Sequence, residues 1–186
     1  AYNFIDRFTV GFFVTSFNLH LREDLSMNPG QVGMYLSLVL IPMSILSYPL
    51  ARLAKKTGAF PLMMSGSVLY GMSLGLAGFT DDKLILFFVL LLAGIGAGVM
   101  FVPSMMSASQ MAPPGLNATV MAAFTGVGSI GFMLGPICST LLELKLKSAI
   151  PDTNIFPILS GIFGSLEILI VLATFPFYIK LKRLSE

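Results

Sequence analysis

The stretch LILFFVLLLAGIGAGVMFVPSMM (residues 84–106) contains no charged side chain and decides the class of fold. A helix of about 20 apolar residues is long enough to cross the hydrocarbon core of a bilayer. A transmembrane barrel would instead show alternating strands of about ten residues. The unbroken run therefore predicts a membrane-spanning helix.

Five more stretches have the same length and apolar character, and short polar connections separate them. They are residues 4–21, 32–51, 61–79, 116–142 and 155–179. No connection is long enough to fold as a soluble domain. The sequence thus predicts an all-α integral membrane protein, with one six-helix transmembrane bundle over residues 1–186.

The composition supports the same class. Of the 186 residues, 55% are hydrophobic and 11% are charged, and the mean hydropathy is +0.88, whereas soluble domains carry roughly 25% charged residues. A net charge of +2 argues against a nucleic-acid partner, because phosphate binding needs a basic face. The chain starts with Ala1 and enters an apolar stretch almost at once, so we expect it to be part of a longer polypeptide.

The distribution of basic residues predicts the orientation in the membrane. With six spans, the termini share one side with the second and fourth connections, and that side holds seven of the 11 Lys and Arg residues. They are Arg7, Arg52, Lys55, Lys56, Lys180, Lys182 and Arg183. Basic loops stay on the cytoplasmic side. We therefore expect both termini in the cytoplasm and the protein in the cell membrane.

A polar stripe runs along the first predicted span. At roughly 100° per residue its members fall within a sector about 80° wide. They are Asp6, Thr9, Phe13, Ser16 and His20. The stripe either lines a water-filled solute path or has its two ends at the membrane interfaces, with Thr9 and Ser16 bonded to their own helix.

Glu167 lies near the centre of the sixth predicted span. A charged side chain there costs about 3 kcal/mol on insertion scales. Its carboxyl is therefore a candidate proton-coupling group, or a neutral acid that is hydrogen-bonded to a neighbouring helix.

Small residues four apart mark the faces where helices approach closely, because helices in lipid associate through close backbone packing. The pairs are Gly71 and Gly75, Gly94 and Gly98, and Gly131 and Gly135, the last followed by Pro136.

No catalytic or metal-binding pattern is present. The sole histidine is His20 and the sole cysteine is Cys138, so serine-protease and zinc constellations are missing. The sequence predicts no enzyme activity, no metal and no cofactor, and passage or binding of a solute is the better hypothesis.

Two motifs resemble those of the major facilitator superfamily. The loop ARLAKKTG (residues 51–58) is similar to the family signature Gly-x-x-x-Asp-Arg-x-Gly, with Ala51, Lys55, Lys56 and Gly58 at the four defined positions. The string GFMLGP (residues 131–136) is similar to its Gly-x-x-x-Gly-Pro motif. The loop lacks the signature's aspartate and the fourth span lacks a buried arginine, and both departures favour the C-terminal half of such a transporter.

The resemblance implies a twelve-helix fold in which two six-helix halves enclose a central cavity. The first, second, fourth and fifth helices of a half would then face the cavity, and Lys55, Lys56 and Gly58 would act in the conformational switch. The implied function is secondary active transport of a small molecule by alternating access, with a proton or sodium ion as coupling partner. A missing half or a second copy would complete the pathway. The alternative is a non-transporting assembly subunit or sensor.

Overall fold

The computed structural model describes residues 2–151 and 153–185, and within these ranges the secondary structure is helical. The elements are α1 (Tyr2–Phe12), η1 (Phe13–Phe17), α2 (Asn18–Glu23), α3 (Pro29–Thr57), α4 (Ala59–Ala77), α5 (Lys83–Gln110), α6 (Asn117–Ala149) and α7 (Phe156–Ser185). The all-α class that the sequence predicts is confirmed.

The first span is one helical course with a π-helical turn, η1, between α1 and α2. A π-helical turn widens the helix locally and is frequent at functional sites. The rings of Phe13 and Phe17 stack at its two ends, 4.5 Å between centroids. The sequence predicted a regular α-helix here, because hydropathy does not report such a turn.

Five further helices are each long and apolar enough to cross a membrane, namely α3, α4, α5, α6 and the part of α7 up to Pro176. Two of them, α3 and α5, contain their predicted stretches and extend beyond them. The helix α4 begins two residues earlier and ends two residues earlier than predicted, and α6 and α7 begin one residue later and extend further at their C-terminal ends. Polar residues outside the apolar run continue a helix for as long as its backbone bonds are satisfied.

Side-chain caps fix where two of the helices begin. The Asn28 side chain accepts a hydrogen bond from the Gln31 backbone N–H at 2.9 Å, and the Gln31 side-chain oxygen accepts one from the Asn28 backbone N–H at 3.1 Å. Asp82 accepts bonds from the backbone nitrogens of the next helix, at 2.8 and 3.0 Å. These capping bonds use backbone donors that otherwise lack partners.

The helices form an open arc. Close packing joins α3 to α5, α5 to α4, α4 to α7 and α1 to α6, whereas α1 contacts α7 and α5 contacts α6 only sparsely. Thus α4 and α7 lie behind, α5 and α1 lie in the middle, and α3 and α6 flank them. One face of α1 and α5 is left open between the flanking helices, and we call it the open face.

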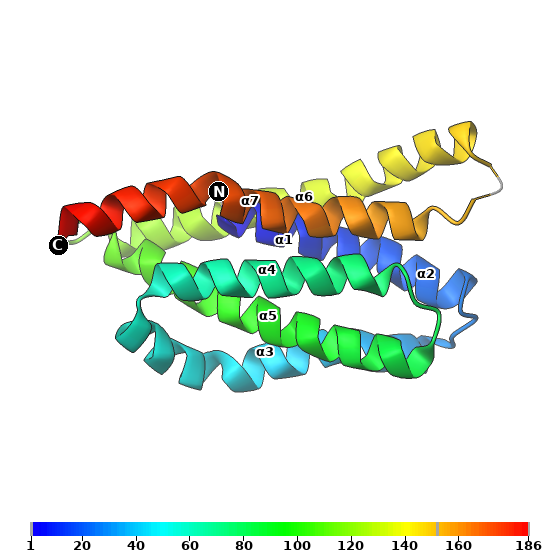
Figure 1. The fold of residues 1–186 in the computed structure, drawn as a ribbon, viewed down its shortest axis with the longest axis horizontal. Coiled ribbons are helices and arrows are strands. Elements are labelled where there is room, and N and C mark those ends of the chain that lie inside the picture. Colours follow the sequence, from blue (N-terminus) through cyan, green and yellow to red (C-terminus); the bar gives the residue numbers. More distant parts are fainter. Residues whose placement is uncertain (1, 152, 186) are drawn as a thin grey trace.

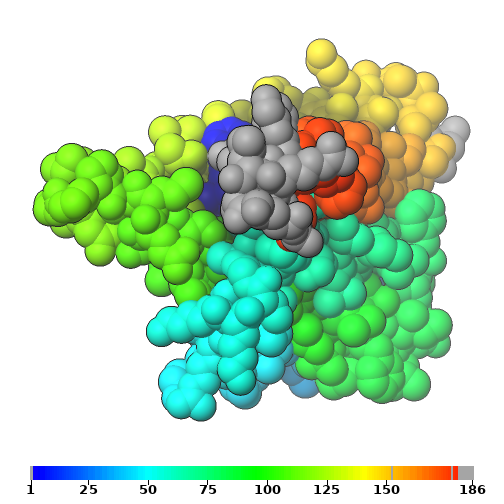
Figure 2. All heavy atoms as spheres, turned by 60° about the vertical axis from the view of Figure 1, so that its left-hand side comes forward, coloured from blue at the N-terminus to red at the C-terminus, as the bar shows by residue number. Residues whose placement is uncertain are grey.

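The C-terminal end of α7 and two connections lie at the same end of the bundle. Figure 1 shows the α3–α4 and α5–α6 connections on the side of the C-terminus, with the other connections at the opposite end. In Figure 2 the α5–α6 connection, in green, stands out from the body of the molecule, and the surface is hollowed between it and the end of α3, in cyan.

Candidate functional site

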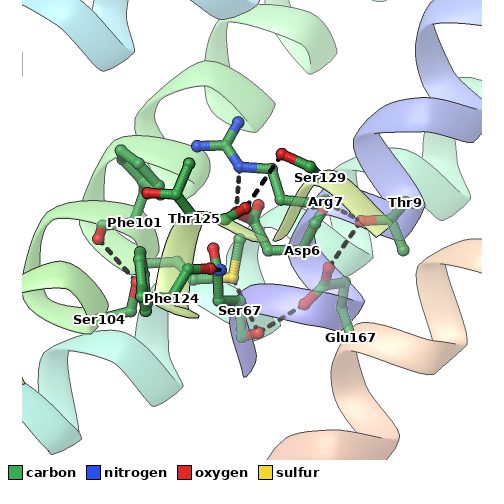
Figure 3. A network of polar contacts seen from close by, with 12 residues as sticks. Asp6, Arg7, Thr9, Ser67, Phe101, Ser104, Phe124, Thr125, Ser129 and Glu167 are labelled. Atoms are coloured by element: carbon green, nitrogen blue, oxygen red, sulfur yellow. Dashed lines mark hydrogen bonds and ion pairs between the residues drawn. The ribbon is translucent and has the colours of Figure 1, made fainter. Parts of the chain in front are cut away.

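A buried carboxylate joins three helices. Glu167 of α7 is 0% exposed. It accepts hydrogen bonds of 2.7 Å from the hydroxyls of Thr9 on α1 and Ser67 on α4. Figure 3 shows the three side chains converging from their separate helices. A buried polar group is tolerated when it is hydrogen-bonded, and this one ties the back of the arc together.

The five residues of the predicted stripe are all buried, and they contact the rest of this bundle rather than the open face. Thr9 bonds to Glu167, and Ser16 bonds to Ser139 of α6. His20 pairs through Nδ1 with Asp24 at 2.6 Å and stacks on Phe156 of α7 at 4.0 Å. The two remaining members, Asp6 and Phe13, are 4% and 5% exposed. A solute path along this stripe stays a prediction.

Arg7 occupies the other side of the same helix. Its side chain is 28% exposed, and its Nε lies 3.7 Å from the carboxylate of Asp6. The guanidinium carbon lies 4.2 Å from the centre of the Phe101 ring on α5. Arg7 thus spans the gap between α1 and α5 on the open face (Figure 3).

Sequence reasoning did not select Arg7 or Ser67 as site residues. Arg7 was counted among the basic residues and placed at the entrance of the first span, although an arginine inside a predicted span is itself a signal of function. Ser67 gave no such signal, because serine is frequent in membrane helices and its partner Glu167 lies 100 positions away.

The predicted switch loop lies where α3 ends and α4 begins. Lys55 and Lys56 are in the last turn of α3, and both are exposed. Gly58 follows with φ of +89°, a conformation that side chains disfavour. Ala51, one helical turn deeper, lines a pocket between α3 and α5. The glycine therefore lets the chain turn back at once into α4.

The predicted packing motif on α6 contacts α1 closely. A Cβ atom on Gly131 would lie 2.5 Å from the Phe4 carbonyl oxygen. One on Gly135 would clash with the Phe8 carbonyl oxygen and lie 2.9 Å from the Phe12 nitrogen. On the α1 side, a Cβ on Gly11 would lie 2.8 Å from Cδ of Pro136. The two backbones are in direct contact.

A family model described as Major Facilitator Superfamily matches residues 2–180. The chain belongs to the major facilitator superfamily. Among curated proteins, no match reaches significance. The size and the arc of helices fit a single six-helix half of a major facilitator fold.

Membership in the superfamily indicates the general function of this chain. Members of the superfamily are transporters rather than enzymes, and they are integral multi-pass membrane proteins. Within residues 2–151 and 153–185, no three His, Cys, Asp or Glu side chains form a group that could hold a metal ion. The side chains of Lys180, Lys182 and Arg183, which contribute to the predicted orientation, lie outside the described part.

Proposed function

We propose that this chain is one half of a secondary active transporter that moves a small solute by alternating access. The observation that carries the proposal is the open face, where Arg7 and Val14 of α1 stay partly exposed between α3 and α6 while α4 and α7 close the back. Such a half supplies one wall of a pathway, and a second half or a second copy supplies the other.

The rigid contact between α1 and α6 supports a rocking motion. Backbones that touch at Gly131 and Gly135 cannot slide without a clash, so these helices move together. The sparse contact between α5 and α6 leaves their shared end free to open or close. Small rotations of rigid groups are the usual way in which packed helices switch between two states.

The experiment asks whether one position is reached from both sides of the membrane. Val14, 41% exposed on α1, is replaced by cysteine in the full natural polypeptide after Cys138→Ser. Alternating access predicts reaction with membrane-impermeant thiol reagents added to either side of right-side-out and inside-out vesicles. Reaction from one side only, or from neither, contradicts the proposal and favours the non-transporting assembly subunit or sensor.

We also propose that both termini face the cytoplasm of a cell membrane. The exposed Lys55 and Lys147 lie at opposite ends of the bundle. Cysteines at these positions give a direct test in intact cells. The proposal requires an impermeant reagent to label Lys147→Cys and to leave Lys55→Cys unlabelled, and the reverse pattern contradicts it.

The proposed coupling ion is a proton carried by Glu167. The carboxyl is enclosed by α1, α4 and α7 and bonded by two hydroxyls, so its charge state affects the packing of three helices at once. The hydroxyls of Thr9 and Ser67 have second acceptors, the Asp6 carbonyl oxygen at 2.9 Å and the Met100 sulfur at 3.1 Å. They therefore keep acceptors if the carboxyl becomes neutral.

A further inference from the structure

Arg7 is a charged side chain within a membrane span, and the packing of the bundle leaves it partly uncovered. A buried or half-buried charge in a membrane span persists where it is paired or where it serves a ligand path. The side chain of its counter-ion, Asp6, is 5% exposed, whereas the Arg7 side chain is 28% exposed. The negative charge therefore lies inside the bundle and the positive group is presented to the open face.

The contacts of Arg7 hold the guanidinium plane and leave one edge free. Asp6 is approached through Nε, and Phe101 lies against the face of the group. No described residue forms a hydrogen bond with the two terminal nitrogens, and Figure 3 shows both pointing away from Asp6. A free guanidinium edge matches a carboxylate, which it binds through two parallel hydrogen bonds.

The surroundings of the free edge come from α6. The Arg7 side chain lies against α6, because a Cβ on Gly128 would lie 3.1 Å from Arg7 Cγ. Figure 3 shows Thr125 and Ser129 of the same helix on either side of Arg7 in that view. Their hydroxyls donate to carbonyls of their own helix, of Met121 and Thr125 respectively, each at 3.0 Å. Both side chains are exposed. The edge is therefore within reach of a solute that enters between α5 and α6.

A largely apolar pocket of about 670 Å³ lies one helical turn from Arg7, toward the end of the bundle that carries the C-terminus. It is lined by Asn3, Ser104 and Phe124 among others. Asn3 lies four residues before Arg7, and Ser104 lies three residues after Phe101. At 1.5 Å rise per residue these offsets are about 6 and 4.5 Å along the helix axes. The side chains of Asn3, which lines the pocket, and Arg7 both lie against Gly128, so the apolar space adjoins the Arg7 side chain.

We infer that Arg7 binds the carboxylate of a small organic acid whose apolar body occupies the pocket lined by Asn3, Ser104 and Phe124. The one free guanidinium edge offers two parallel donors, which match one carboxylate group. That this solute is transported rests on the proposed function. The inference adds the chemical class of the solute, a monocarboxylate with an aromatic or aliphatic body.

The test measures charge preference next to Arg7 and requires no transport. Ser129→Cys in a Cys138→Ser background of the full natural polypeptide is labelled in liposomes with two reagents of similar length. One is anionic, methanethiosulfonate ethylsulfonate, and the other is cationic, methanethiosulfonate ethyltrimethylammonium. We expect Arg7→Gln to lower the ratio of anionic to cationic labelling rates about threefold or more, because a unit charge acts strongly within a Debye length of about 8 Å. Arg7→Lys should keep most of the ratio.

Thr140→Cys in the same Cys138→Ser background is the matched control. Thr140 is exposed on the same side of the same helix as Ser129, about 16.5 Å further along at 1.5 Å per residue. Its labelling ratio should not change with Arg7→Gln. An equal fall at both cysteines would show a general effect on the fold and overturn the inference, as would an unchanged ratio at Ser129→Cys.

Benzoate and benzamide provide the second measurement, because they differ in charge and share a ring. Benzoate should slow the labelling of Ser129→Cys, benzamide should not, and the protection should disappear in Arg7→Gln. Equal protection by both compounds, or by neither, overturns the carboxylate assignment. If size-exclusion chromatography shows that Arg7→Gln is misfolded, the comparison of benzoate with benzamide in the protein that keeps Arg7 tests the carboxylate assignment. The carboxylate inference can fail in this labelling test while Val14→Cys still reacts from both sides of the membrane. Failure of the inference is therefore distinguishable from failure of the proposed transport function.

Discussion

The hydroxyl of Thr9 donates a 2.7 Å hydrogen bond to the carboxylate of Glu167, which joins α1 to α7 at a point that is fully enclosed. Ser67 of α4 completes the contact from a third helix. Three helices on the closed side of the arc therefore share one carboxyl group. A change in the protonation or hydrogen bonding of this carboxyl therefore alters the packing of α1, which also forms part of the open face.

Glu167→Gln should leave the fold intact and remove proton coupling. The amide keeps one acceptor and the shape of the acid, so the melting temperature in detergent should change little. Uptake driven by an imposed pH gradient should be lost, while exchange of labelled solute across the liposome membrane persists. Glu167→Leu is the contrasting variant, and it should cost about 1–3 kcal/mol through lost interhelical bonds. Gradient-driven uptake at the natural rate in Glu167→Gln would assign the carboxyl a purely structural role.

Gly135→Ala should destabilise the protein. The added Cβ would clash with the Phe8 carbonyl oxygen, and such overpacking typically costs about 1–3 kcal/mol. Gly126→Ala is the matched control on the same helix, because no atom lies within 4 Å of its added Cβ. Melting temperatures of the two variants should differ clearly, with Gly126→Ala at or above the natural value. Equal melting temperatures would show that α1 and α6 separate easily.

Gly58→Ala should weaken the α3–α4 connection through backbone strain. At φ of +89° a side chain costs on the order of 1–3 kcal/mol, and the chain can relieve it by changing the angle between the two helices. We expect slower two-sided labelling of Val14→Cys in this variant, with insertion into the membrane unchanged. Gly33→Ala, also on α3 and without neighbours within 4 Å, serves as the control and should label at the natural rate.

Cysteines on the two sides of the first span should react differently. Thr9 is 0% and Ser16 is 5% exposed, whereas Val14 is 41% exposed. In the Cys138→Ser background, impermeant thiol reagents should label Val14→Cys and spare Thr9→Cys and Ser16→Cys in the absence of solute. Rapid labelling of Thr9→Cys would instead support the predicted solute path along the polar stripe.

Hydropathy predicted the class of fold because each apolar run is long enough to meet the bilayer, and this needs no knowledge of neighbours. Periodicity also grouped Thr9 with Ser16 correctly on one side of a helix. Periodicity could not predict which side of the first span stays exposed, because that depends on where α6 and α7 pack against it. The π-helical turn at Phe13–Phe17 and the pairing of Thr9 with Glu167, 158 positions apart, are tertiary features that a single span does not encode.

The partners of α1 have a consequence for synthesis of the chain. Its polar side chains bond to residues made much later, Ser16 with Ser139 and Thr9 with Glu167, the latter separated by 158 positions. At about 5–20 residues per second, the first helix waits on the order of ten seconds for these partners. During that interval its polar groups face lipid, the translocation machinery or a chaperone. Ribosome-bound chains that end before α6 should therefore be the most vulnerable to membrane quality control.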